Sequence, residues 1–434
     1  MLTVRQNSNI GKAIVALAIL LVWTQLAPVS LSASDKNKNK GKAQATKAEP
    51  TGPRFPASFD TSKLVWPGPP NIGRIKYLTY FAGMKIDYTP ADKKPKKKQG
   101  WMDRLAGEQE KGEKQILKEF PFQLIGPYGI AIDSKGQVYV ADQRVGAVFI
   151  FNTETRDVQM IRNRFEASFG LINGVAIDDN DRLFVSDGKT HRVLIFNANH
   201  QVENQITDGL IDPVGMAIDT DNRLLYVVDT QQDQVLVYDV DRLKLLRRIG
   251  TGGKNHFLTD PGNFGAPSNV AVDKDGNVYV TDTMNNRVEI FDADGQFVSL
   301  FGRHGDGPGD FARPKGIAVD CDGHIWVADQ LQDRLQVFDR EGQLLAFVGG
   351  HGNYPGQFEA LVGVAIDKQN RVFTTEQYPG RMQVFRYITD AEAVQEKARR
   401  QEELDKKAGE KQAAPTADKD KSNVEVKPQS SPAQ

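Results

Sequence analysis

The sequence is poor in cysteine, in net charge and in long apolar runs, and each shortage excludes a class of protein. Its 434 residues include one cysteine, Cys321, so neither an intramolecular disulfide nor a cysteine-only zinc cluster can form. Lys and Arg number 55 against 56 Asp and Glu, which gives a formal net charge of −1. This balance excludes a globally basic nucleic-acid-binding protein, and we expect no nucleic-acid partner.

The N-terminal apolar run, Ala13–Trp23, is shorter than the roughly 20 residues that cross a bilayer. Arg5 and Lys12 precede it, and small residues follow it at positions 30–34, an order typical of a cleaved signal peptide. We therefore predict a signal peptide over residues 1–32 and an exported protein, in the periplasm or at the cell surface. The alternative is an uncleaved inner-membrane anchor that leaves the protein facing the periplasm and provides its membrane contact.

Charge-rich segments flank and interrupt the apolar part of the chain. Residues 33–53 are rich in Lys and nearly free of apolar side chains, which predicts a flexible tether. The charged tail, residues 389–434, is expected to be largely disordered, although the alternating charges of 391–411 are consistent with a solvated helix. Inside the chain, the insert 84–120 carries a KKPKKK run that predicts a solvated loop or, alternatively, a weak attraction to anionic lipid or an acidic partner.

The rest of the sequence contains one unit repeated six times. Each copy has three short runs of β-branched and aromatic residues, and the first runs read PYGIAID, INGVAID, PVGMAID, PSNVAVD, PKGIAVD and LVGVAID. The second run of each copy contains an aromatic residue, and the third contains another 12 positions later, as Tyr139 and Phe151 illustrate. This constant spacing predicts two strands joined by a turn of fixed length.

A repeat of about 45 residues with three or four strands is typical of a β-propeller blade. We predict an all-β fold, a six-bladed β-propeller over residues 54–388 with disordered or helical charged tails. The blades are expected near residues 127–165, 172–208, 213–250, 267–302, 314–349 and 361–387. The sixth copy lacks an outer strand, whereas residues 74–83 have the outer-strand pattern. We expect this N-terminal segment to complete blade 6 and close the ring, because closure removes exposed strand edges.

These repeats resemble the NHL-repeat family of six-bladed propellers. The resemblance lies in the GVAVD-like strands, in turns such as Asp282–Val288, and in the loops FGRHGDGPGDF (301–311) and VGGHGNYPGQF (348–358). The segment VWPGPPNIGRIKYL (65–78) is also similar to a segment of exported bacterial members. The resemblance implies the fold but no single function, because the family includes scaffolds, RNA binders and enzymes.

An acidic residue ends the second run of every copy. These ring acids are Asp142, Asp187, Asp229, Asp282, Asp329 and Glu376. Because one acid recurs in each blade, we expect a structural role, with backbone N–H groups and nearby arginines as partners. The expected arginines are Arg192, Arg287, Arg334 and Arg381. The acidic turns that begin at Asp273, Asp292 and Asp320 lack the closing Glu of a calcium loop and predict tight hairpins.

Candidate binding residues stand at the start of the inner strands, where side chains would reach the mouth of the central channel. They are Tyr128, Asn173, Val214, Ser268, Asn269, Lys315 and Val362. A lactonase-type calcium ion would need Glu, Asn and Asp ligands in this channel. Asn173 and Asn269 are candidates for it, but no Glu stands beside them.

Three histidines occupy related positions in the loops that lead into blades 4, 5 and 6: His256, His304 and His351. The family resemblance extends to amidating lyases that hold zinc with histidines of an NHL-type propeller, and neutral imidazoles are suitable ligands for that ion. No histidine stands at the channel-mouth positions, however. We therefore expect no cofactor, with zinc or calcium as the alternative.

These observations favour a non-catalytic binding scaffold of the bacterial cell envelope, and we assign no catalytic residue. One propeller face, built from the loops between blades and the 84–120 insert, is expected to hold an envelope protein or a glycan. The alternative is an enzyme, a metal-dependent lyase or a lactonase-like protein with its site in the channel.

Overall fold

The computed structural model describes residues 60–83, 123–163, 166–252 and 258–413, with side chains up to residue 406. The predicted signal peptide, the tether, the insert and the end of the tail lie outside the described residues. Among the helices of the described part, none is both long and apolar enough to cross a membrane.

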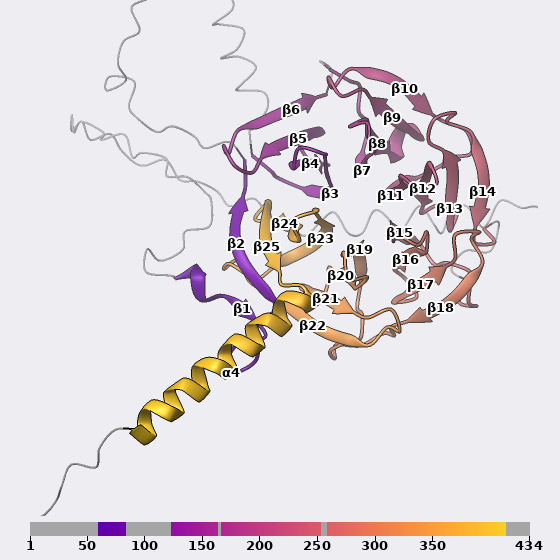
Figure 1. The fold of residues 1–434 in the computed structure, drawn as a ribbon. Helices are drawn as coiled ribbons and strands as arrows, with labels where there is room; N and C mark the ends of the chain where they lie inside the picture. Colours follow the sequence, from indigo (N-terminus) through magenta and orange to yellow (C-terminus); the bar gives the residue numbers. More distant parts are fainter. Residues whose placement is uncertain (1–59, 84–122, 164–165, 253–257, 414–434) are drawn as a thin grey trace, which may run out of the picture. The chain divides into compact units, whose positions relative to one another are not determined.

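Six antiparallel sheets surround a central axis in the described part of the chain, with the first strand of each blade nearest the axis (Figure 1). Blade 1 contains β3 (Pro127–Ile132), β4 (Gln137–Asp142), β5 (Ala147–Asn152) and β6 (Val158–Arg162). Blade 2 contains β7 (Ile172–Ile177), β8 (Leu183–Asp187), β9 (Arg192–Phe196) and β10 (Val202–Ile206), with the short 3-10 helix η2 (Gly188–Thr190) in a turn. Blade 3 contains β11 (Pro213–Asp219), β12 (Leu224–Asp229), β13 (Gln234–Asp239) and β14 (Leu245–Ile249).

The second half of the ring continues in the same pattern. Blade 4 contains β15 (Pro267–Val272), β16 (Val278–Asp282), β17 (Arg287–Phe291) and β18 (Phe297–Phe301). Blade 5 contains β19 (Pro314–Val319), β20 (Ile325–Asp329), β21 (Arg334–Phe338) and β22 (Leu344–Gly349). The inner strands β23 and β3 pack against each other, so the last blade meets the first.

Blade 6 combines strands from the two ends of the propeller sequence. Its C-terminal strands are β23 (Glu359–Ile366), β24 (Arg371–Tyr378) and β25 (Arg381–Tyr387). The N-terminal strand β2 (Ile75–Phe81) pairs antiparallel with β25, from Ile75 opposite Tyr387 to Phe81 opposite Met382. The predicted closure of the ring is therefore confirmed. A further strand, β1 (Val65–Trp66), follows η1 (Thr61–Lys63) and adds a fifth strand to this sheet.

The apolar core is divided among the interfaces between blades. Buried apolar residues of the described chain form six clusters, and each cluster draws its members from two neighbouring blades. The predicted 12-residue aromatic pairs belong to these clusters: Tyr139 is 4% exposed and Phe151 is fully buried. A blade cannot cover its own faces, so each sheet is stable only between its neighbours.

The chain leaves the propeller through a single helix, α4 (Asp390–Ala413), directly after β25. Glu392 accepts a hydrogen bond from the backbone N–H of Thr389 at 2.9 Å, which caps the helix start. Of the two expectations for the charged tail, disordered or helical, this part is helical.

Candidate functional site

The ring acids hold the loops at one face of the propeller. All six are fully buried. In blade 1, Asp142 accepts hydrogen bonds from the backbone N–H groups of Ile125 (2.7 Å) and Val145 (2.9 Å). The first bond fixes the loop that leads into the blade, and the second fixes the turn after β4. Corresponding bonds recur in the other blades, so the structural interpretation of the ring is confirmed.

Two of the four expected arginine partners are confirmed and two are wrong. Arg287 donates to Asp282 at 2.8 Å, and Arg381 pairs with Glu376 in full burial. Arg192 instead donates to the carbonyl of Ser168 at 2.7 Å, and Arg334 donates to the carbonyl of Asp306 at 3.1 Å. In blades 2 and 5, backbone N–H groups satisfy the ring acid, so the arginine reaches a loop carbonyl directly.

The central channel narrows to a cavity of about 60 Å³ near the start of the inner strands. In five blades, the residue directly after the candidate channel-mouth residue of the inner strand is glycine. A Cβ atom on Gly129 would lie 2.5 Å from the carbonyl oxygen of Asn173, and one on Gly316 would lie 2.5 Å from that of Val362. The glycines therefore allow neighbouring inner strands to approach closely. Blade 4 departs from this pattern, because Asn269 occupies the equivalent position.

Beside this cavity, side-chain hydroxyl groups join neighbouring blades at every second blade interface. Ser186 of blade 2 donates to the carbonyl of Val214 in blade 3 at 2.6 Å. Thr281 of blade 4 donates to the carbonyl of Lys315 in blade 5 at 2.9 Å. Thr375 of blade 6 donates to the carbonyl of Tyr128 in blade 1 at 2.7 Å. These bonds fix the backbone of two channel residues, Tyr128 and Lys315, that carry polar side chains.

Six of the seven candidate binding residues line the cavity, and Val214 does not. The Val214 side chain instead packs into the apolar cluster between blades 3 and 4. In this cluster Val214 has apolar neighbours such as Val228 and Phe264, and these contacts favour burial of its side chain between the blades.

Two of the remaining candidates are occupied by bonds within the protein. Asn173 accepts a hydrogen bond from Gln143 and donates to the carbonyl of Pro213. Ser268 is 5% exposed and interacts with the hydroxyl groups of Thr281 and Thr283. Their polar atoms hold strands together, so we assign them to the wall of the channel.

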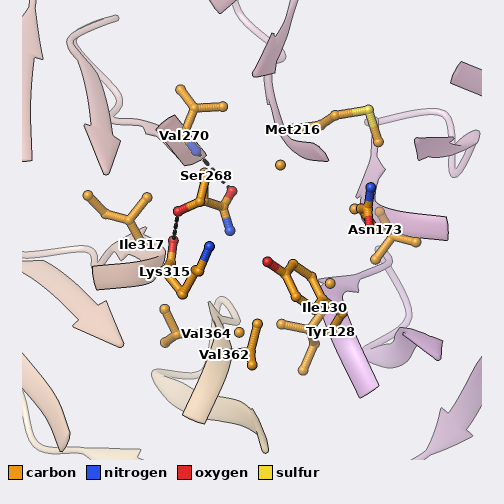
Figure 2. Close-up of a pocket in the computed structure, with 16 residues that line it drawn as sticks. Tyr128, Ile130, Asn173, Met216, Ser268, Val270, Lys315, Ile317, Val362 and Val364 are labelled. Carbon is orange, nitrogen blue, oxygen red and sulfur yellow. Dashed lines mark hydrogen bonds between the residues drawn. The ribbon is translucent and has the colours of Figure 1, made fainter. Parts of the chain in front are cut away.

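Three side chains have donor groups available to a ligand: Tyr128, Asn269 and Lys315. In Figure 2 the phenol of Tyr128 and the amine of Lys315 point toward each other across the channel. Asn269 also lines the cavity, and its Oδ1 accepts a hydrogen bond from the backbone N–H of Val270 at 2.9 Å, which leaves its Nδ2 as a donor. Burial raises the pKa of Tyr128 to about 12. Burial, followed by the neighbouring Arg313, lowers the pKa of Lys315 to about 8.

The cavity does not fit a calcium ion. Its polar side chains within the described residues are those of Tyr128, Asn173, Ser268, Asn269 and Lys315, with no carboxylate among them. Calcium prefers several oxygen ligands, usually including carboxylates, and an ammonium group repels it.

The histidine candidates are likewise not brought into one cluster. Across the described ranges, no group of three or more His, Cys, Asp or Glu side chains is placed to hold a metal. His351 lies 2.8 Å from Asp333, with 75% of its side chain exposed. His304 forms a backbone bridge with Phe311, and His256 lies outside the described residues.

An exposed apolar feature, which the repeat pattern did not indicate, lies on the face that carries the channel mouth. Three consecutive blades place a large apolar residue two positions after the ring acid: Met284, Leu331 and Tyr378, which are 59%, 65% and 44% exposed. We call these three residues the apolar arc. Blades 1 to 3 have Arg144, Lys189 and Gln231 at this position. A comparison of the six turns, position by position, would have revealed the arc.

Strand pairing places the arc on the same face as Tyr128 and Lys315. Pro314 at the start of β19 pairs with Asp329 at the end of β20, so the turn that contains Leu331 lies at the strand end where Lys315 stands. The same pairing joins Pro267 to Asp282 in blade 4. The channel mouth and the apolar arc are therefore parts of one surface.

Comparisons with known protein families agree with this architecture. A family model described as the SMP-30/gluconolactonase/LRE-like region matches residues 186–301, and a model of the NHL repeat matches residues 169–196 and 311–338. The two NHL matches cover equivalent parts of blades 2 and 5. With the six sheets described above, they identify this chain as an NHL-type six-bladed β-propeller. No curated protein matches the sequence.

Several solved structures are similar to this chain at low sequence identity. Virginiamycin B lyase from Staphylococcus aureus is 13% identical, with 61% of this chain and 96% of that chain covered and a TM-score of 0.45. A gluconolactonase from Xanthomonas campestris is 17% identical, with 61% and 87% covered and a TM-score of 0.47. A structural genomics protein from Bacteroides thetaiotaomicron is 19% identical, with 61% and 70% covered and a TM-score of 0.49. Similarities of this degree carry no inference about function.

Proposed function

We propose that this protein is an exported, non-catalytic binding scaffold of the bacterial cell envelope and that it holds no cofactor. The face that carries the channel mouth would hold an envelope protein or a glycan. The observation that carries the proposal is the apolar arc, where Met284, Leu331 and Tyr378 are 59%, 65% and 44% exposed on consecutive blades. Large apolar side chains gathered on one surface are typical of interaction sites.

The burial and the hydrogen bonds of the ring acids support the same function. The ring acids are fully buried and bound to loop N–H groups, so they support the face without reaching its surface. The loops are thereby held in place before a partner arrives. A rigid surface loses little conformational entropy on binding, which favours affinity.

The second candidate function is an enzyme of the lyase or lactonase type. The match of residues 186–301 to the SMP-30/gluconolactonase/LRE-like region favours it. The chemistry of the channel favours the scaffold, because Lys315 and neutral groups stand where a metal-dependent site would need carboxylates or imidazoles.

The proposed function is tested by capture from native envelope extracts and on a glycan array. The test variant carries Met284→Gln, Leu331→Gln and Tyr378→Gln. The matched control carries Lys189→Gln and Gln231→Ala at the same position of blades 2 and 3, and it leaves out Arg144 because that side chain donates to the hydroxyl of Tyr378. We expect the test variant to lose at least about ten-fold of the captured partner, because interface aromatic and apolar anchors each contribute about 1–2 kcal/mol or more. The control should retain binding.

Equal capture by both variants would refute the assignment of the face. The enzyme alternative predicts a different result. Treatment with a chelator would then abolish a hydrolytic or lyase activity, whereas the scaffold binds its partner equally well with and without the chelator.

A further inference from the structure

Two residues at the channel mouth differ from those that the other blades have at the equivalent positions. In blade 4, Asn269 stands at the position that is glycine in the five other blades. In the adjacent blade 5, Lys315 follows the first residue of the inner strand, where other blades have uncharged side chains. A repeat preserves the positions that the fold needs. Side chains that break the repeat and face a common cavity are therefore candidates for ligand recognition.

The available groups at this mouth are donors. Lys315 contributes an ammonium group, Asn269 contributes Nδ2, and Tyr128 contributes its phenol O–H. Lys315 makes no ion pair with any carboxylate of the described chain, and the residues that line the cavity there include no acid. A partly buried ammonium group without a counter-ion is unfavourable, so an anion that enters the cavity would relieve a cost already present in the fold.

The backbone that carries these donors is held in place. The carbonyl of Lys315 accepts hydrogen bonds from Thr281 (2.9 Å) and Ser268 (3.1 Å), and the carbonyl of Tyr128 accepts one from Thr375 (2.7 Å). The backbone N–H of Asn269 donates to the hydroxyl of Thr281 at 3.0 Å, so the donors have fixed origins on three different blades. Such an arrangement is preorganised for a small ligand.

The size and the apolar wall of the cavity restrict the ligand further. Its volume is about 60 Å³, which is room for roughly four to six water-sized groups. Besides the donors and the polar groups of Asn173 and Ser268, which are bound within the protein, the wall carries apolar side chains. The apolar side chains stand directly after the recurring glycine of the inner strand, or after Asn269 in blade 4, and they are Ile130, Val175, Met216, Val270, Ile317 and Val364. Figure 2 labels all of them except Val175. A carboxylate with one small apolar group fits this space, whereas a whole pyranose ring exceeds it.

We propose that the channel mouth binds a terminal carboxylate attached to a small apolar group, as found at the C-terminus of a peptide that ends in alanine. Lys315 pairs with the carboxylate, Asn269 and Tyr128 donate to its oxygens, and the apolar wall receives the methyl group. The peptide source is favoured over a free short-chain carboxylate because the apolar arc lies on the same face and can contact the preceding residues. In this respect the inference rests on the proposed function.

The experiment measures protection of Lys315 from acylation in the full-length protein, by peptide mass spectrometry at pH 7.5. The probes are the peptide acetyl-Gly-Ser-Gly-Ser-Gly-Ala with a free C-terminus, the same peptide with a C-terminal amide, and propionate. We expect the free acid to slow acylation of Lys315 at least three-fold and the amide to leave it unchanged. Lys368, on the opposite face of the propeller, serves as the internal control and should react equally with all probes.

Binding of the free acid by variants provides a second measurement. Lys315→Met and Tyr128→Phe should each weaken binding, the former at least ten-fold, while Lys368→Met should not. Asn269→Gly restores the glycine of the other blades, so it should keep the fold, monitored by circular dichroism and melting, and still weaken binding at least three-fold.

Other results of these experiments would overturn the site, the peptide source or the proposed binding face. Equal protection by acid and amide, or unchanged binding by Lys315→Met, overturns the carboxylate site. Protection by propionate alone overturns the peptide source. If the apolar arc variant captures the partner as well as the unchanged protein while the free acid still protects Lys315, the proposed binding face is refuted and the carboxylate site stands.

Discussion

At the scale of single residues, His324 connects three parts of the molecule. It lies in the turn between β19 and β20, with its Nδ1 3.1 Å from Asp320 and 3.0 Å from the hydroxyl of Tyr387 in β25. Asp322 accepts hydrogen bonds from Tyr387 (2.9 Å) and from the backbone N–H of Asp390, the first residue of α4. Asp390 also pairs with Arg74 ahead of β2. Blade 5, strand β25 of blade 6 and the start of the helix thus meet around His324.

The pKa of His324 is raised, chiefly by its hydrogen bond to Asp320 and against the effect of burial. A raised pKa in the folded state means that the protonated form stabilises the fold. This contribution is complete below the ordinary histidine pKa and is lost as pH rises through the folded-state pKa.

We therefore predict that His324→Asn is destabilised more at pH 6 than at pH 8.5, by about 1 kcal/mol. Urea unfolding at the two pH values measures this difference. His304→Asn, at an exposed loop position, is the control and should show the same small effect at both. A pH-independent loss for His324→Asn would contradict the role of the charge.

At the scale of elements, buried arginines fasten loops to blades. Arg381 at the start of β25 pairs with Glu376 and donates to the carbonyls of Asn353 (2.6 Å) and Gln357 (3.0 Å) in the preceding loop. Arg287 makes the corresponding contacts in blade 4. One guanidinium thus satisfies loop carbonyls and a buried acid together, which explains how loops without regular secondary structure stay fixed.

Replacement of Arg381 by leucine is predicted to lower the free energy of unfolding by about 3–5 kcal/mol, because Glu376 would remain buried without its counter-ion. The matched control is Arg192→Leu, at the equivalent position of blade 2, where the arginine donates to a loop carbonyl instead of the ring acid. That variant should lose about 1 kcal/mol. Chemical denaturation measures both, and equal losses would refute the distinction.

At the scale of the whole molecule, stability depends on closure by β2. This strand pairs with β25 and also contributes Ile75 and Tyr77 to the cluster between blades 5 and 6. Without it, β25 would present an unpaired edge and that cluster would lose part of its cover.

We predict that the chain without residues 54–85 does not fold cooperatively. Thermal melting followed by circular dichroism checks this. A chain without residues 414–434, which lie outside the described residues, is the control and should melt as a single transition. A deletion variant that melts like the full chain would show that closure by β2 is dispensable.

The sequence by itself determined the ring. Six copies fix six blades, the 12-residue spacing of residues such as Tyr139 and Phe151 fixes the pairing of the middle strands, and the missing outer strand of the last copy points to residues 74–83. These features are local in the chain or recur at a regular period, so they can be recognised from the sequence alone.

Only the tertiary structure decided which channel side chains are available to a ligand. Asn173 is occupied by Gln143 and Pro213, Val214 packs between blades, and Lys315 keeps its amine in the channel. The tertiary structure likewise decided that Arg381 pairs with a ring acid, whereas Arg192 donates to a loop carbonyl. Each of these outcomes depends on a partner from another blade or from a distant loop. Such partners are brought together only when the ring closes, and the repeat pattern does not encode them.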